Sequence, residues 1–158
     1  MIRPARPEDA AAIAALLNHW IANTAITFTP TPKTAGDIAD QIAAKAAAGH
    51  GFFVAVEDGA LLGQASYGQF RAGAGYATCM EHSISLARGQ GLGRALLQAV
   101  EDHARTGGAH QMIAGVSGEN PEGRAFHDRM GYRLVATVPQ AGFKFGRFMD
   151  LWLMQKFL

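Results

Sequence analysis

Hydrophobic and polar positions change their spacing several times along the chain, and each change predicts a different element. In the first fifty residues the apolar positions around Ile13 recur at helical spacing, which predicts a helix over residues 7–18. Thr34 and Asp37 have the spacing of a capping box, so a second helix is predicted over residues 35–48. The chain therefore begins with two helices.

From residue 52 onward the pattern becomes that of strands. Two apolar runs, 52–56 and 61–70, flank an Asp58-Gly59 pair that is typical of a tight hairpin turn. A glycine-rich turn at 88–93 then precedes a strongly amphipathic helix that Gly107 and Gly108 close. The other predicted elements are extended runs over 76–86 and 111–116, a short helix over 122–130, and final strands over 132–138 and 143–155.

This order predicts an α/β fold in which helices flank a mixed, mostly antiparallel central sheet. The length of 158 residues suits one domain, and neither a repeat nor a linker-like segment divides it. Hydrophobic residues make up 49% of the chain and charged residues 17%, a composition typical of a folded protein. We therefore predict a single domain spanning residues 1–158.

Composition also narrows the function classes. A formal net charge of +1 does not favour a nucleic-acid-binding or membrane-surface protein. Cys79 is the single cysteine, which excludes an internal disulfide framework and a multi-cysteine zinc site, and the six histidines lack metal-ligand spacing. No apolar run is long enough to span a membrane and no secretory leader is evident. The expectation is a metal-free cytoplasmic protein.

The distribution of charge is more informative than its sum. Between residues 59 and 100 the only carboxylate is Glu81, whereas three arginines are present: Arg71, Arg88 and Arg94. A segment so poor in acids is suited to an anionic ligand.

The turn at residues 88–93 is the strongest local motif. Its alternating glycines let a backbone approach a ligand closely, and the helix that follows directs free N–H groups and the positive end of its dipole toward the same place. Phosphate is the natural ligand, although the motif is neither a Walker loop nor the dinucleotide fingerprint. A tight strand-to-helix turn without a ligand is the alternative.

Glu81 lies in a predicted strand, where it shares a face with Ser83 and Ser85. It is either a solvated residue on an open sheet face or a general base, since partial burial raises the pKa of a carboxyl group.

These residues resemble a known family. Arg88-Gly89-Gln90-Gly91-Leu92-Gly93 is similar to the cofactor loop of the GNAT acyltransferase superfamily. Further similarity extends over nearly the whole chain and indicates the phosphinothricin and methionine-sulfoximine N-acetyltransferase branch. It includes residues 62–68, Glu81-His82-Ser83, and Lys144-Phe145-Gly146-Arg147-Phe148.

The resemblance implies a binding site for acetyl-CoA. Arg88, Gly89, Gln90, Gly91, Leu92, Gly93 and Arg94 would hold its pyrophosphate. The backbone of Ser83, Ile84, Ser85 and Leu86 would pair with the pantetheine amides and stabilise the acyl oxyanion, and Asn120 would help hold the pantetheine arm. Only Ala87 separates Leu86 from this loop, whereas relatives have a few more residues there.

The resemblance also implies the chemistry. Glu81 would be the general base that deprotonates the acceptor amine, and His127 the acid that protonates the leaving thiolate, unless His127 is only a packed helix residue. Phe28, Arg71 and Tyr76 would contact the acceptor. Ala77 stands where relatives often carry an arginine for the acceptor's anionic groups.

The implied function is direct acetyl transfer to the primary amine of a small amino-acid-like acceptor, of the phosphinothricin, methionine sulfoximine or methionine sulfone type. Another small amine, a non-catalytic acyl-CoA-binding protein and an unrelated phosphate-binding module are the alternatives. Members of this branch are commonly homodimers. The aromatic residues Phe143, Phe145, Phe148 and Trp152 are expected in the core or at a subunit contact.

Overall fold

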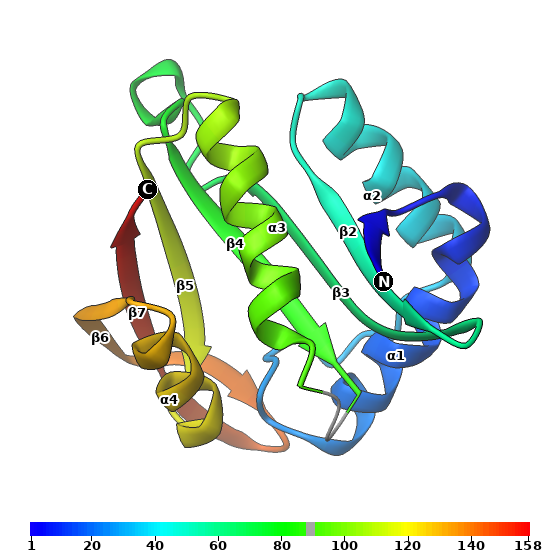
Figure 1. Cartoon of the computed structure of the whole chain (residues 1–158). Helices are drawn as coiled ribbons and strands as arrows, with labels where there is room; N and C mark the ends of the chain where they lie inside the picture. Colours follow the sequence, from blue (N-terminus) through cyan, green and yellow to red (C-terminus); the bar gives the residue numbers. More distant parts are fainter. Residues whose placement is uncertain (88–90) are drawn as a thin grey trace.

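A mixed sheet forms the centre of the molecule in a computed structural model that describes residues 1–87 and 91–158 (Figure 1). Its strands are β1 (Ile2–Pro4), β2 (Phe52–Glu57), β3 (Ala60–Gln69), β4 (Cys79–Leu86), β5 (Gln111–Ser117), β6 (Arg133–Lys144) and β7 (Arg147–Phe157). In the described part of the chain their order is β1-β2-β3-β4-β5-β7-β6. All neighbours are antiparallel except β4 and β5, which confirms the predicted mixed, mostly antiparallel sheet.

Helices cover both faces of this sheet. They are α1 (Ala10–Asn23), α2 (Ala35–Ala47), α3 (Gly93–Thr106) and α4 (Pro121–Arg129), with short 3-10 turns η1 (Pro7–Asp9) and η2 (Ala74–Tyr76). Strand β2 shows why both faces of the sheet need a cover, since alternate side chains of a strand face opposite sides and both sets are apolar here. Phe52 and Val54 pack in the cluster under α1 and α2, whereas Phe53 and Ala55 pack in the larger cluster that includes α3.

Local chemistry explains where several elements begin and end. The predicted capping box is present: Asp37 N–H donates to Thr34 Oγ1 at 3.0 Å, and Thr34 N–H donates to Asp37 Oδ2 at 2.8 Å. Asp58 and Gly59 both have positive φ, as a two-residue hairpin turn of this type requires.

The structure corrects some predicted boundaries. The first helix continues to Asn23, and the extended run expected from residue 76 begins only at Cys79, after η2. The last hairpin turn was placed wrongly: the chain reverses at Phe145 and Gly146, both with positive φ, inside the run expected to be one strand. Phe143, Phe145 and Phe148 are thereby exposed on this hairpin rather than buried in the core. The short edge strand β1 had no counterpart in the prediction.

Strands β4 and β5 separate along their length, and this positions the site. They pair in parallel from Cys79–Gln111 to His82–Ala114, and no pairing continues beyond that point in the described residues. Figure 1 shows the two strands diverging toward the end where α4 and the start of α3 lie. A gap between two strands leaves backbone groups without a sheet partner, so this end of the sheet can accept a ligand.

Candidate active site

Backbone groups of β4 face the gap in a regular alternation. Just after β4, Ala87 N–H donates to Leu62 O at 2.7 Å, and the register with β3 is unbroken. In an antiparallel ladder only alternate residues bond to a given neighbour, so odd-numbered residues of β4 bond to β3. The backbone groups of Ile84 and Leu86 therefore turn toward β5, where pairing has already ended at His82. An extended ligand can bond there as an added strand.

The same alternation divides the four residues predicted to bind a ligand through their backbone, residues 83–86, into two pairs with different neighbours. Ser83 and Ser85 pair with Ser66 and Gln64 of β3, so their N–H and C=O groups already have partners. We therefore expect the backbone contacts of β4 to come from its even-numbered residues.

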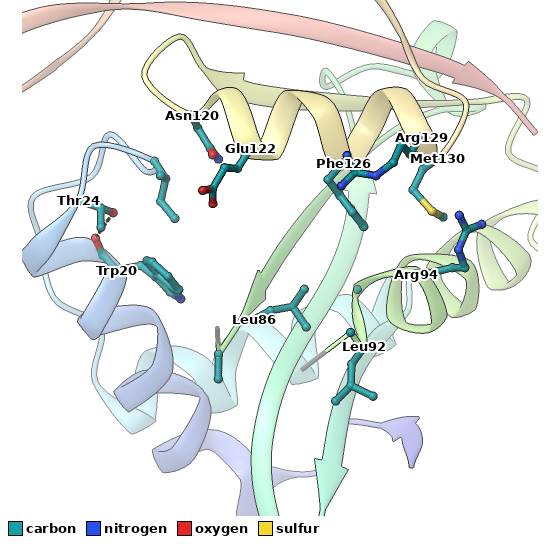
Figure 2. Close-up of a pocket in the computed structure, with 14 residues that line it drawn as sticks. Trp20, Thr24, Leu86, Leu92, Arg94, Asn120, Glu122, Phe126, Arg129 and Met130 are labelled. Atoms are coloured by element: carbon teal, nitrogen blue, oxygen red, sulfur yellow. Dashed lines mark hydrogen bonds between the residues drawn. The ribbon is translucent and has the colours of Figure 1, made fainter. Parts of the chain in front are cut away.

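The larger cavity, of about 490 Å³, lies beside this gap (Figure 2). It is built from the end of α1 and the loop after it, the end of β4, the start of α3 and one side of α4. Its lining residues are Trp20, Thr24, Ile26, Leu86, Ala87, Gly91, Leu92, Gly93, Arg94, Asn120, Glu122, Phe126, Arg129 and Met130. This volume is typical of small-molecule sites.

Glycine and helix geometry explain why α3 opens onto this cavity. Gly91 has φ +63°, and nothing lies within 4 Å of where its Cβ would be. At Gly93 a Cβ would come within 3.0 Å of the Leu86 and Phe126 side chains, so this position keeps the cavity wall open. The first N–H groups of α3 have no carbonyl partner within the helix, and the helix dipole makes this end positive.

Two arginines add positive charge at one end of the cavity. Figure 2 shows Arg94 of α3 and Arg129 of α4 on the side away from Trp20 and Thr24. Arg94 was predicted, whereas Arg129 was missed because it belongs to no motif and only the packing of α4 brings it here. Arg88, Gly89 and Gln90, which were predicted to bind the same anion, lie outside the described residues.

Asn120 has a structural role as well as a place in this cavity. Its Oδ1 accepts a hydrogen bond from Gly123 N–H at 2.9 Å and so caps the start of α4, with Pro121 in the first turn. Its amide N–H groups have no acceptor among the described residues, which leaves them available to a ligand in the cavity.

A smaller cavity, of about 240 Å³, lies on the α1 and α2 face of β4. It contains Glu81, as the strand alternation predicted, together with Ser83 on the same face. The complete lining is Lys45, Ser66, Gly68, Gln69, Glu81, His82 and Ser83. The Glu81 carboxylate lies against β5, with Oε1 at 3.2 Å from where a Cβ of Gly115 would be.

Burial raises the pKa of Glu81, and the positive charge of Lys45 partly opposes this shift. The carboxylate is about half-buried, so it is accessible from the cavity while losing part of its hydration. A carboxylate with a raised pKa is a better proton acceptor than one with the ordinary value. This is the environment that a general base requires.

His127 lies on the other side of β4, under the sheet. Its Nδ1 is 2.7 Å from Gly123 O and its Nε2 is 3.2 Å from His82 Nε2. In the neutral ring Nδ1–H donates to the carbonyl, so Nε2 accepts from His82. Burial lowers the pKa of both histidines, that of His82 to about 3. His127 lines neither of the two cavities described, and both its nitrogens are engaged.

The predicted acceptor residues lie outside these two cavities. Arg71 and Tyr76 belong to the exposed segment between β3 and β4, where Gln69 Nε2 donates to Arg71 O at 2.7 Å and so holds the segment near the smaller cavity. Phe28 lies against β6, with ring atoms 2.5 Å from where a Cβ of Gly142 would be. The cationic residue in the smaller cavity is Lys45, which sequence reasoning missed.

Other kinds of site receive no support from the described residues. Among residues 1–87 and 91–158, no group of histidine, cysteine, aspartate and glutamate has the geometry of a metal site. No described helix is long and apolar enough to cross a membrane.

The sequence matches the family described as Acetyltransferase (GNAT) domain over residues 2–153. The chain belongs to this family.

Curated relatives cover nearly the whole chain. The L-amino acid N-acyltransferase MnaT of Escherichia coli (strain K12) is 38% identical over 98% of this chain and 91% of its own length. The L-methionine sulfoximine/L-methionine sulfone acetyltransferase of Salmonella typhimurium is 35% identical over 98% of this chain and 92% of its own.

A solved structure agrees closely with this GNAT domain. The phosphinothricin acetyltransferase from Sinorhizobium meliloti, in complex with AcCoA, superposes with a TM-score of 0.95 at 31% identity. The match covers 100% of this chain and 88% of that one. The fold prediction is thus confirmed in its topology and in its family.

Proposed function

We propose that this GNAT enzyme transfers the acetyl group of acetyl-CoA to the primary amine of a small amino-acid-like acceptor, of the methionine sulfoximine, methionine sulfone or phosphinothricin type. One observation carries the proposal: both cavities adjoin β4. The larger reaches it at Leu86, and the smaller reaches it at Ser83 and Glu81. The names of the relatives and the acetyl-CoA bound by the Sinorhizobium enzyme support the same pairing of substrates.

The larger cavity has the donor set that a phosphate-bearing thioester needs. The start of α3 and the cations Arg94 and Arg129 suit the phosphates. Asn120 and the gap-facing backbone of Ile84 and Leu86 suit the amides of the pantetheine arm. The predicted contributions of Arg88, Gly89 and Gln90 belong to the same proposal. Acetyl-CoA brings an acyl group activated as a thioester.

Glu81 is the proposed general base. An α-ammonium group cannot attack a carbonyl until it has lost a proton, and the Glu81 carboxylate accepts that proton. The freed amine nitrogen then forms a bond to the acetyl carbonyl carbon, the carbon–sulfur bond breaks, and the nitrogen gives up its second proton so that a neutral amide forms. The thiolate leaves with the bonding electron pair and takes up a proton. Backbone N–H groups of β4 that face the gap can stabilise negative charge on the carbonyl oxygen.

His127 is the predicted acid for that last proton, and its role stays a prediction. Its lowered pKa and its hydrogen bonds to Gly123 and His82 are those of a neutral, packed ring. The proposed transfer does not depend on it, since water also protonates a thiolate. The roles of Phe28, Arg71 and Tyr76 toward the acceptor likewise stay predictions.

We also propose a homodimer that acts in the cytoplasm. Support comes from the β6–β7 hairpin at the edge of the sheet, where Phe143, Phe145 and Phe148 are 58%, 55% and 62% exposed. Exposed aromatic groups of this kind are typical of subunit contacts. Light scattering should give twice the monomer mass for the wild type. In the Phe148→Glu variant the measured mass should shift toward that of the monomer. A monomeric wild type at micromolar concentration would contradict the dimer.

An acceptor panel tests the proposed activity. Release of free thiol from acetyl-CoA is measured with L-amino acids, methionine sulfoximine, methionine sulfone, phosphinothricin and polyamines. Turnover with the amino-acid-like compounds, and little with polyamines, is expected. Preference for polyamines would support another small-amine acetyltransferase. Tight acetyl-CoA binding without turnover across the panel would support the non-catalytic alternative and overturn the enzyme.

A further inference from the structure

Lys45 lies in the last turn of α2 and points its ammonium group into the smaller cavity. Its Nζ is 2.9 Å from where a Cβ of Gly68 would be, so the absence of a side chain at Gly68 makes room for it. Gly68 lies directly opposite Glu81 in the pairing of β3 with β4. A cation and a carboxylate from distant segments therefore border the same small cavity.

Among the described residues, the half-buried Lys45 ammonium lacks the partners that the Lys144 and Lys156 ammonium groups have. Lys144 Nζ donates to Thr24 O at 2.7 Å and to a second carbonyl, and Lys156 Nζ bonds to Glu101 Oε2 at 2.6 Å. Within the part of the chain that the structure describes, Lys45 Nζ has no hydrogen-bond acceptor, and no carboxylate lies within 4.0 Å. Desolvation of an ammonium group is costly when no acceptor compensates it.

Two other titratable groups face Lys45. Glu81 approaches from β4, and its negative charge raises the pKa of Lys45 against the lowering caused by burial. His50, just after α2, has its pKa lowered by burial and then by the charges of Lys45 and His103, which favours its neutral form. The cavity thus combines one positive and one negative group.

We propose that Lys45 binds the α-carboxylate of the acceptor while Glu81 faces its α-ammonium group. This inference rests on the proposed function, and it assigns the carboxylate contact to a residue of α2 that lines the smaller cavity. An amino acid zwitterion carries its two charges on groups attached to one carbon. It is therefore complementary to a cavity that carries the opposite charges on its two sides.

The remaining lining of the cavity suits such a ligand. Ser66, Gln69 and Ser83 supply polar groups that can bond to a carboxylate or an ammonium. Gly68 and Gly115 keep side chains away from Lys45 and Glu81 respectively, which leaves space between the two charges.

A pair of acceptors that differ only in the carboxylate tests this contact. Methionine sulfone is compared with 3-(methylsulfonyl)propylamine, its decarboxylated analogue. The assay pH is kept well above the pKa of Glu81 so that its carboxylate stays ionised. For Lys45→Met we expect the KM for methionine sulfone to rise about 10- to 100-fold, as loss of a charged hydrogen bond predicts. The KM for the amine should stay within about twofold of wild type. Lys45→Arg should recover much of the affinity.

Controls separate this inference from the proposed function. Lys33→Met removes a lysine that lines neither cavity and should behave as wild type with both acceptors. Thermal unfolding checks that Lys45→Met remains folded. Equal losses with both acceptors would overturn the carboxylate contact and leave the acetyltransferase intact, since Lys45 would then act through Glu81 or the fold. A wild type that acetylates neither compound, nor any other acceptor of the panel, would instead reject the proposed function itself.

Discussion

The two cavities beside β4 are built in different ways. The larger one combines apolar side chains such as Trp20, Leu86 and Phe126 with the glycine-containing start of α3, and Arg94 and Arg129 add charge at one end. The smaller one is formed by side chains of opposite charge, Lys45 and Glu81, from α2 and β4. The first arrangement suits a cosubstrate that a whole family shares. In the smaller cavity, a few side-chain substitutions would be enough to change which acceptor fits.

This difference predicts that each cavity can be damaged separately. Changes in the smaller cavity should affect turnover or acceptor affinity while acetyl-CoA binding persists. Changes around the larger cavity should affect acetyl-CoA, with the acceptor's KM unchanged.

The largest effect is expected at Glu81. Glu81→Gln removes the proton acceptor, so kcat should fall by about 10²- to 10⁴-fold while the Kd for acetyl-CoA is retained. Thiol release measures the first quantity and calorimetry the second. Glu57→Gln, at an exposed carboxyl group at the end of β2, is the matched control. Unchanged kcat in Glu81→Gln would remove Glu81 from the mechanism.

Lys144, near the end of β6, supports the segment after α1 that forms part of the larger cavity. Its bonds to Thr24 O and Thr27 O hold the segment that carries Ile26 at the cavity. Lys144→Met leaves both carbonyls without this donor, so the free energy of unfolding should fall by about 1–3 kcal/mol. Urea denaturation measures this change. The KM for acetyl-CoA should rise and that for the acceptor should not. Equal increases in both KM values would contradict the separation of the cavities.

The opposite face of β4 should control the stability of the protein in acid. The folded pKa of His82 is lowered to about 3, against about 6.5 in an unfolded chain. As pH falls from about 6.5 toward 3, the unfolded state therefore takes up protons first. The free energy of unfolding should decrease by up to about 1.4 kcal/mol per pH unit for this group.

Urea denaturation at several pH values measures that slope. His82→Gln should lower this slope by the amount that corresponds to one proton taken up on unfolding, because glutamine does not titrate. Its amide can still donate a hydrogen bond to His127. The same slope in His82→Gln and wild type would show that His82 titrates normally in the folded protein.

The smallest effects are expected at the two arginines of the larger cavity. Arg94 and Arg129 are exposed at its rim, where solvent screens their charges, so Arg94→Gln or Arg129→Gln should raise the KM for acetyl-CoA about three- to tenfold. High salt should reduce the difference from wild type. Arg133→Gln, an exposed arginine on β6, serves as control. An altered KM for the acceptor in Arg94→Gln or Arg129→Gln would contradict the assignment of these arginines to acetyl-CoA.

Much of the larger cavity could be predicted from the sequence because its parts are contiguous. A run of glycines before an amphipathic helix specifies the backbone that opens onto a ligand, and Gly91, Gly93 and Arg94 do line the cavity. Arg129 could not be found in this way, since it is one of several basic residues on short elements and only the packing of α4 against β5 selects it.

The sequence by itself determined the α/β class with helices flanking a central sheet, most helix and strand positions, the face on which Glu81 lies, and the glycines at the start of α3. These properties depend on periodicity and on neighbours within a few residues. Only the tertiary structure decided that Lys45 of α2 faces Glu81 across Gly68, and that Ile84 and Leu86 rather than Ser83 and Ser85 turn toward the gap. The reason is physical: contacts between residues far apart in the chain depend on strand register and helix packing, which local patterns do not specify.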